Sequence, residues 1–419
     1  MLRRARWVLA LGGCALGCGE TPAPVASEFR FDAPVLVYQA PADALSGAWL
    51  VDAGGGRVFA VLSAKLPDGA EGALVIERLG SGWSAPFAWT RPLGAGAERV
   101  MGVVAWPSPA VLSLATTATG SLLVTRTFAG RGWSAPVAVT TPGAERPVIA
   151  RLAEGGARTK GVGGFDLVYG VASTGCEGAM ELRHRRSAAT PLLTPEDLPV
   201  WGAARTVAST CGVSSLAAAT DGATLAVAWT GAALGLSASG ARDVYAARGV
   251  VGTDGVGFGA PTLVMQGANR DVSAAPLGAG AYLLGWAQRA SGGDGVESGL
   301  QRAAWASYDP VLSAWTRVNT WWFFSRGAPV LRGDGEGTAL ALGRDGDFAM
   351  SPVTLVRWTA ARAVRTRSGV GNVVGEVTSM SFQRMDDGGV EAIWVEALPQ
   401  GGGTRVMWTR GAASIDGGV

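Results

Sequence analysis

The stretch GWSAP at residues 82–86 follows an apolar run, and the same five residues return at 132–136. The two copies lie 50 residues apart, and looser versions of the phrase continue along the chain. A repeat of this length that is built from short strands is typical of a β-propeller, a ring of four-stranded blades. The repeat therefore predicts the architecture. It leaves the activity open, because propellers carry many unrelated functions.

Each repeat unit contains four short strands, which we call a to d from the first to the last. Alternating or wholly apolar runs of five to eight residues, separated by Gly, Asp, Asn and Pro, predict an all-β chain. The a–b hairpin is found seven times, at 48–52 with 57–62, 101–106 with 110–115, 148–152 with 165–171, 215–219 with 223–229, 273–277 with 281–287, 328–332 with 338–342, and 379–384 with 390–396. The sequence thus predicts a seven-bladed propeller, although the irregular third and sixth units are also compatible with six or eight blades.

The phrase that opens strand d has a displaced copy near the start of the chain. Later copies open at Trp83, Trp133, Trp201, Phe258 and Trp315, with a weak one near Ala361. The run FDAPVLV at residues 31–37 resembles the copy at 133–137, yet it precedes the first strand a. A strand d in that place can pair only with a last blade that ends at strand c, near Trp408. We therefore expect the N-terminal strand to complete the last blade, which removes an exposed sheet edge.

The aromatic residue of the phrase has a structural explanation. Strand d is the outermost strand of a blade, and one of its faces lies against the neighbouring blade. A tryptophan there buries about 150–250 Å² and holds adjacent blades together. The following proline lacks an N–H and is tolerated on an edge strand. We favour this packing role over a row of ligand-binding tryptophans.

Residues 1–17 resemble a lipoprotein-type signal peptide. Arg3, Arg4 and Arg6 precede an uncharged, mostly apolar stretch that is too short to span a bilayer. A cysteine after small residues resembles the lipobox of bacterial lipoproteins. Cys18 leaves a hydrophobic segment of more usual length, whereas Cys14 has the better residue three positions earlier, and a signal with unmodified cysteines is a third reading.

This reading divides the chain into the signal at 1–17, a lipidated cysteine with its tether at 18–28, and one propeller domain at 29–419. It predicts a partner, the lipid membrane, through the acylated cysteine. It also predicts a place in the bacterial cell envelope, as an outer-membrane lipoprotein that faces the periplasm or the cell exterior. Residues 1–17 hold three arginines and no acidic residue, so their removal changes the formal net charge from +2 to −1. A nearly neutral body argues against nucleic acid as a partner.

The remaining cysteines predict a disulfide. Cys176 and Cys211 form an even pair in an exported and therefore oxidising setting. A single histidine, His184, gives little support to a tetrahedral metal site. We regard His184 as a polar strand residue, because its arginine neighbours supply no orienting carboxylate.

We expect no cofactor. The acidic turns at 334–336, 345–347 and 386–387 could hold calcium on carboxylates and carbonyls, but Asp-Gly is also what hairpin turns require. None of them matches a full calcium loop.

The repeat phrases, the a–b hairpins and the lipobox together resemble the sialidase-type and lectin-type propellers of exported bacterial lipoproteins. This resemblance covers most of the mature chain in architecture but only a few residues per blade. A clear Asp-box is absent, and the catalytic set of that family, three arginines with a Tyr–Glu nucleophile and an acid Asp, cannot be assembled from the sequence. No catalytic residue is predicted.

Ligand recognition has one local candidate. Residues 320–324, TWWFF, place four aromatics in a row, and they cannot all face inward because strand side chains alternate. Trp321, Trp322 and the nearby Arg326 are therefore candidates for binding a sugar or a protein, unless a loop covers the strand. Insertions at 154–164, 173–200, 231–241 and 291–299 are further places for function.

The sequence as a whole predicts a surface-anchored, non-enzymatic binding or scaffold propeller that recognises a protein or a glycan. The alternative is a diverged sialidase-like carbohydrate-active enzyme, which requires acidic residues and arginines in the central channel. A structural subunit of an envelope complex is a third hypothesis.

Overall fold

The computed structural model describes residues 29–155, 164–189, 191–232, 242–252, 255–267, 269–289, 301–325, 327–344, 352–359 and 366–413. The predicted signal and tether, 1–17 and 18–28, lie outside these residues. No helix in the described ranges is long and apolar enough to span a membrane. The short 3₁₀ turns η1 (Pro92–Gly94) and η3 (Pro399–Gly401) lie between strands of the described chain.

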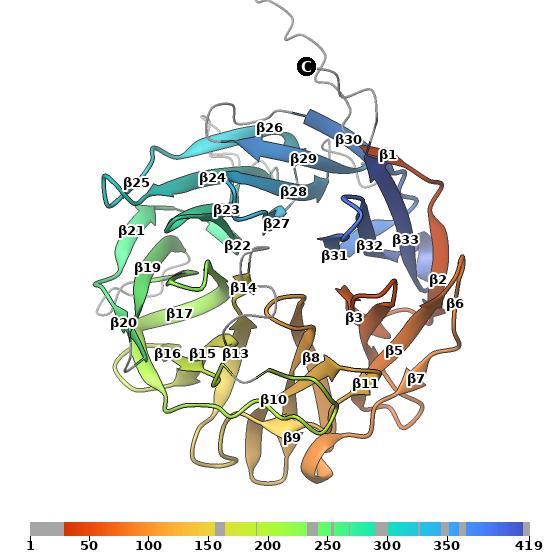
Figure 1. Ribbon diagram of the computed structural model, residues 1–419, viewed down its shortest axis with the longest axis horizontal. Helices are drawn as coiled ribbons and strands as arrows, with labels where there is room; N and C mark the ends of the chain where they lie inside the picture. The colour runs from red at the N-terminus through yellow and green to blue at the C-terminus, as the bar shows by residue number, and fades with distance from the viewer. Residues whose placement is uncertain are drawn as a thin grey trace, which may run out of the picture.

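The chain is an all-β propeller whose sheets are arranged in a ring (Figure 1). Within the described residues, five sheets of four or five strands are separate from one another. They contain β3 (Leu45–Asp52), β4 (Val58–Lys65), β5 (Glu71–Leu79), β6 (Gly82–Trp83) and β7 (Phe87–Ala88); β8 (Ala97–Val104), β9 (Ala110–Thr117), β10 (Gly120–Ala129), β11 (Gly132–Trp133) and β12 (Val137–Ala138); β22 (Asn269–Gly278), β23 (Ala281–Arg289), β24 (Gln301–Asp309), β25 (Ala314–Trp315) and β26 (Asn319–Ser325); β27 (Val330–Gly333), β28 (Thr338–Arg344), β29 (Val353–Thr359) and β30 (Thr366–Gly371); and β31 (Glu376–Arg384), β32 (Val390–Ala397) and β33 (Thr404–Ala413) with β1 (Phe29–Phe31) and β2 (Val35–Ala40).

A sixth sheet has nine strands and bends in the middle. Its members are β13 (Pro147–Leu152), β14 (Glu154–Gly155), β15 (Asp166–Ala172), β16 (Ala179–Arg186), β17 (Arg205–Thr220), β18 (Thr224–Ala232), β19 (Asp243–Gly252), β20 (Gly255–Phe258) and β21 (Thr262–Met265). The long strand β17 pairs with β16 up to Cys211, and it pairs with β18 at Cys211 and, after a register shift, from Ser215 onward. Gly212 lies between the two halves with φ +58°, a left-handed conformation that favours glycine.

All seven predicted a–b hairpins occur as antiparallel strand pairs. Strand a lies at the centre of the ring in each case, and strand d lies at the outside (Figure 1). We call the face where the innermost strands begin, as at Leu45, the upper face, and the face where they end, as at Asp52, the lower face. Because neighbouring strands are antiparallel, the a–b and c–d connections lie on the lower face and the b–c connections on the upper face.

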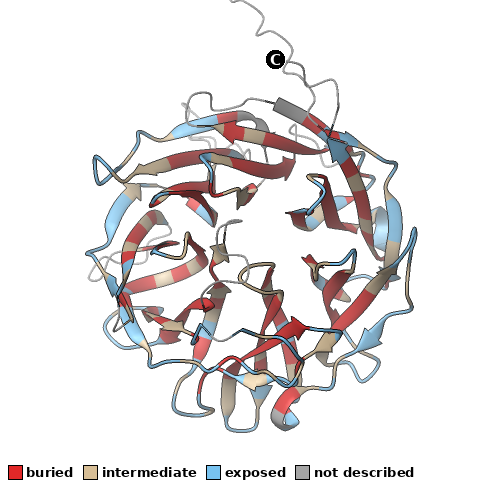
Figure 2. Cartoon of the chain, viewed as in Figure 1, coloured by how far each residue is buried: buried red, intermediate tan, exposed pale blue. Residues whose placement is uncertain are grey.

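The hydrophobic core lies between neighbouring sheets, and buried residues follow the strands around the whole ring (Figure 2). The tryptophans of the repeated phrase belong to these layers. The ring of Trp83 lies 5.6 Å from that of Trp408, which is on the last sheet, and Trp133 lies 5.4 Å from Phe59 on the preceding sheet. The predicted packing role of the phrase is confirmed at these two positions.

The serine of the phrase has a role that the sequence did not suggest. Ser134 Oγ accepts a hydrogen bond from the Thr127 N–H at 3.1 Å and donates to the Ala135 carbonyl at 2.9 Å. Strand d is interrupted there, between β11 and β12. The hydroxyl therefore replaces a ladder bond that the backbone cannot supply.

We expect Ser134→Ala to lower the free energy of unfolding by about 1–3 kcal/mol, because a buried backbone N–H loses its acceptor. Ser84 Oγ accepts the Glu77 N–H in the same way at 3.0 Å but is half-buried, so Ser84→Ala is a matched control with a smaller expected loss. Chemical denaturation of both variants measures the difference. Equal stabilities of the two variants and the wild type would contradict the assignment.

Strand exchange between the two ends of the chain closes the ring. β2 pairs with β33 from Val35 opposite Trp408 to Ala40 opposite Thr404, and β1 continues the ladder at the end of β33. The predicted completion of the last blade by an N-terminal strand is confirmed.

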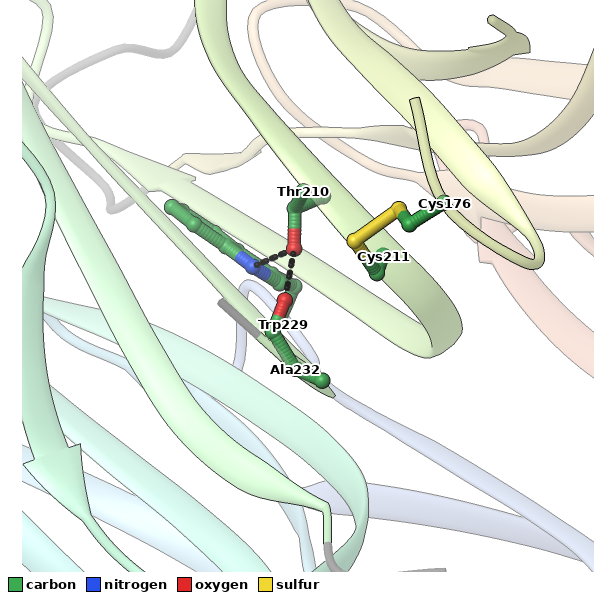
Figure 3. The surroundings of a disulfide bond; sticks show 5 residues. All are labelled: Cys176, Thr210, Cys211, Trp229 and Ala232. Carbon is green, nitrogen blue, oxygen red and sulfur yellow. Dashed lines mark hydrogen bonds between the residues drawn. A yellow bond between two sulfur atoms is a disulfide. The ribbon is translucent and has the colours of Figure 1, made fainter. Parts of the chain in front are cut away.

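The disulfide predicted between Cys176 and Cys211 is present and joins the β15–β16 connection to the bend of β17 (Figure 3). Next to it, Thr210 Oγ1 accepts a hydrogen bond from Trp229 Nε1 at 3.2 Å and donates to the Ala232 carbonyl at 3.1 Å. These contacts fix the strand at the point where it crosses from the outside of the ring to the centre.

Candidate functional site

A funnel opens at the upper face between the innermost strands. Its central cavity has a volume of about 360 Å³ and is lined by residues of β3, β8, β13, β14, β17, β22, β27 and β31. Two cavities of about 430 Å³ each join it at the upper face. One shares Asp271 and Val330 with the central cavity, and the other shares Trp49 and Arg151. We call the three together the funnel.

Trp49 supplies an aromatic surface in the funnel wall. It lies on β3, is half-buried, and lines both the central cavity and one of the adjoining cavities. Its ring covers Gly47, where an added Cβ would lie only 2.3 Å from the ring. A side chain at position 47 would therefore displace the indole, so glycine is needed for the ring to lie against the strand.

Arg151 supplies a positive charge that hydrogen bonds fix in place. Its Nη1 donates hydrogen bonds to the carbonyls of Met101 at 2.8 Å and Ala150 at 2.9 Å. Burial lowers the pKa of Arg151, the nearby charge of Arg99 lowers it further, and the carboxylate of Asp271 acts in the opposite direction. Two arginines thus line the same cavity, where an anionic or strongly polar ligand would be favoured.

Asp271 enters the funnel from a distorted position in β22. It has φ +43°, and the pairing of β22 with β23 shifts register between Arg270 and Val272. A non-glycine residue with positive φ is uncommon and costs of order 1–3 kcal/mol. The bulge carries an exposed carboxylate that lines two of the three cavities.

An ion pair crosses the funnel nearer the lower face. Arg332 on β27 pairs with Glu154 on β14, and Arg332 Nε donates to the Phe382 carbonyl at 3.2 Å. β14 lies inside the ring and pairs in parallel with the end of β17 (Figure 1). Burial lowers the pKa of Arg332 to about 10. The first residue of the predicted insertion at 154–164 therefore narrows the funnel, while 156–163 lie outside the described residues.

The funnel combines an aromatic face, guanidinium groups and carboxylates, which is a set suited to polar ligands with an apolar ring face. It also includes hydroxyls that the protein already uses. Ser379 Oγ, for example, accepts a hydrogen bond from the Ala48 N–H at 3.4 Å. No tyrosine lines the three cavities within the described part of the chain. The Tyr–Glu nucleophile of sialidase-type enzymes therefore has no counterpart among these lining residues.

The aromatic run lies elsewhere, on β26 at the outside of the ring. Trp321 has only 1% of its surface exposed and packs with Trp305 and Trp358 between two sheets. This corrects the prediction for Trp321, because a buried ring offers no surface to a ligand. The side chain of Trp322 and the whole of Arg326 lie outside the described residues.

The histidine has a partner that the sequence did not reveal. His184 Nε2 lies 2.8 Å from Asp166 Oδ1, and both side chains are almost fully buried. Asp166 is on the neighbouring strand β15, where the register places it opposite Arg186. The carboxylate comes from the neighbouring strand and not from the residues that flank His184 in sequence, and the burial of the pair agrees with the predicted role of a polar strand residue.

In the acidic turns that the structure describes, carboxylates of Asp334 and Asp387 accept hydrogen bonds from backbone N–H groups of their own turn. Asp334 Oδ1 accepts hydrogen bonds from the N–H groups of Glu336 at 2.8 Å and Thr338 at 3.0 Å. Asp387 Oδ1 accepts the Gly389 N–H at 3.0 Å. Residues 345–347 lie outside the described ranges, and no group of three metal-ligating side chains occurs within those ranges.

Sequence patterns did not predict the funnel residues, although they predicted most of the strands that carry them. Arg151 and Arg332 each interrupt an otherwise mostly apolar innermost strand. A charged residue in such a strand is a usable signal, since the innermost strands of a propeller line its centre. The sequence pattern around Asp271 was a weaker signal for a funnel residue, because a bulge in β22 decides where this side chain points.

No protein-family model matches the sequence, and no curated protein sequence matches it. Solved structures with the same architecture do exist. An ulvan lyase, a polysaccharide lyase solved with a bound saccharide, is 10% identical with a TM-score of 0.50, over 92% of this chain and 94% of that one. A protein of unknown function from Dyadobacter fermentans is 9% identical with a TM-score of 0.49, over 92% and 100% of the two chains. A sialidase from Streptococcus pneumoniae is 8% identical with a TM-score of 0.48, over 94% and 71%. At these identities the likeness to the ulvan lyase supports the β-propeller fold and says nothing about activity.

Proposed function

We propose that this protein is an extracytoplasmic binding propeller that holds a saccharide in its funnel without cleaving it. The observation that carries this proposal is that Trp49, Arg151 and Asp271, from three different sheets, line one connected cavity. A sugar has apolar C–H faces that stack on an indole and hydroxyls that bond to charged groups. The paired arginines 99 and 151 favour an acidic sugar over a neutral one.

The proposal includes seven blades, a single propeller domain over 29–419, and an anchor at Cys18. The blade count is supported by the two halves of the nine-stranded sheet, which face each other across a core that contains Leu182, Leu216 and Trp229. A flat sheet could not do this, so we count its halves as two blades. The disulfide is consistent with a place outside the cytoplasm. The bacterial envelope and the acylated cysteine stay predictions from the sequence.

Saccharide binding is tested by a glycan array followed by calorimetry on the best ligand. We expect Trp49→Ala and Arg151→Gln each to weaken binding about tenfold or more, because each removes a contact of about 1–2 kcal/mol. Matched controls are Phe87→Ala, an exposed aromatic on the outer strand β7, and Arg131→Gln, an exposed arginine on the lower face, neither of which should change affinity. Absence of any saccharide ligand, or equal affinities for all four variants, would overturn the proposal.

A diverged carbohydrate-active enzyme is the second candidate, and the distorted carboxylate of Asp271 favours it. This candidate predicts that the bound saccharide is cleaved and that Asp271→Asn abolishes cleavage while binding persists. Release of new sugar ends from the array-selected ligand is the measurement. Recovery of the intact ligand after prolonged incubation would contradict this candidate and would leave binding as the function.

A further inference from the structure

The most exposed apolar side chains in the described part of the chain lie mainly on one face. Within the described residues, seven large apolar side chains are more than half exposed. One of them, Val374, precedes the innermost strand β31 on the upper face. The other six lie in, or within three residues of, connections between strands c and d on the lower face: Leu79, Leu193, Val200, Val250, Val311 and Leu312.

Aspartate carboxylates fix the backbone of two of the connections that carry these side chains. Asp309 Oδ1 accepts the N–H groups of Val311 at 2.8 Å and Leu312 at 3.2 Å, which fixes the turn that carries the two most exposed side chains, at 90% and 73%. Asp197 Oδ2 accepts the Leu193 N–H at 2.9 Å and holds the connection before β17 in the same manner. Soluble proteins expose single apolar residues freely, but a set restricted to one face indicates an interaction surface.

The chain also enters the fold on this face. β33 is a strand c and ends on the lower face, and Phe29 pairs with Ala413 at that end. The predicted anchor at Cys18 is only eleven residues before Phe29. An extended link of that length spans at most about 40 Å. An acylated Cys18 would thus join the fold at the same face that carries the apolar turns.

We propose that the lower face docks on the lipid bilayer, with the apolar turns inserted among the lipid headgroups and the funnel directed away from the membrane. One acyl-anchored residue and several shallow apolar side chains act together, as membrane attachment usually needs more than one contribution. The inference rests on the proposed anchor and is independent of the saccharide. It explains why the upper face, which carries the ligand cavities, exposes only Val374 from this set.

The test uses the full chain, produced with its signal in a bacterial host, extracted in detergent and reconstituted into vesicles of phosphatidylethanolamine and phosphatidylglycerol. The mass of the N-terminal peptide reports acylation. A cysteine introduced as Val311→Cys, or as Val374→Cys on the opposite face, is labelled with an environment-sensitive dye while the native disulfide stays oxidised. Both positions are exposed in turns or connections, so neither change should prevent folding.

We expect the dye at position 311 to shift to the blue on reconstitution and to be quenched at least about threefold more slowly by a water-soluble quencher. The emission and the quenching rate of the dye at position 374 should be the same with and without vesicles. Equal quenching at 311 with and without vesicles, or protection at 374 instead, would overturn the proposal. An unmodified N-terminal peptide would overturn it as well, and saccharide affinity, measured separately, shows whether the proposed function stands.

Discussion

Removal of residues 29–40 is expected to prevent formation of a stable ring. These residues supply β1 and β2, the only partners of β33 on its outer side within the described chain. Without them, the β33 ladder opposite Val35–Ala40 is unpaired, and the core around Ala40, Ile393 and Trp408 becomes exposed. We expect the deletion to lower the free energy of unfolding by an amount close to, or larger than, the 5–15 kcal/mol that stabilises a typical domain. An open last blade also offers an edge for aggregation.

A circular permutant is the control for this deletion. Strand β33 ends and β1 begins on the same face, so residues 29–40 can be joined after Ala413 through a short turn, with the chain starting at residue 41. The permutant contains the same blade as one continuous segment and should recover the elution volume and the cooperative thermal transition of the wild-type chain. A deletion chain that unfolds at the wild-type midpoint would show that the terminal strand does not close the ring.

Replacement of both disulfide cysteines, as Cys176→Ser with Cys211→Ala, is expected to lower the free energy of unfolding by about 2–4 kcal/mol. The bond closes a loop of 35 residues and ties the β15–β16 connection to the bend of β17. Alanine is chosen at 211 because this position is fully buried, and a serine hydroxyl there would add a second cost. Urea denaturation at a fixed temperature measures the change.

Reducing agent separates the bond from the side chains. Wild-type protein with reductant should approach the stability of the double variant, and the double variant should be insensitive to reductant. A wild-type protein that keeps its full stability when mass analysis shows two free thiols would contradict a stabilising role for the bond.

Much of the fold could be predicted because its signals are local. The Trp-Ser-Ala-Pro phrase, the period-two runs and the Asp-Gly turns each act within a few residues, and they placed all seven a–b hairpins. The displaced phrase at 31–37 predicted the closure, because a strand d without its own strand c has one free partner. Cys176 and Cys211, the two cysteines outside the N-terminal signal region, form the most direct pair.

The candidate site could not be predicted in this way. Trp49, Arg151 and Asp271 are separated by more than a hundred residues from one another, and each is ordinary within its own strand. The aromatic run at 320–324 looked more like a binding site, yet packing against Trp305 and Trp358 buries Trp321. His184 likewise found its carboxylate, Asp166, across a strand pair.

The sequence by itself determined the repeat, the strands, the closure of the ring and the disulfide, since these follow from side-chain alternation, turn chemistry and pairing within or between adjacent elements. Only the tertiary structure decided which residues line the funnel and which turns form the exposed apolar face. Ring geometry brings one residue from each distant innermost strand to a common centre, and antiparallel pairing sends all c–d turns to one face. Both depend on distances between elements that no local pattern encodes.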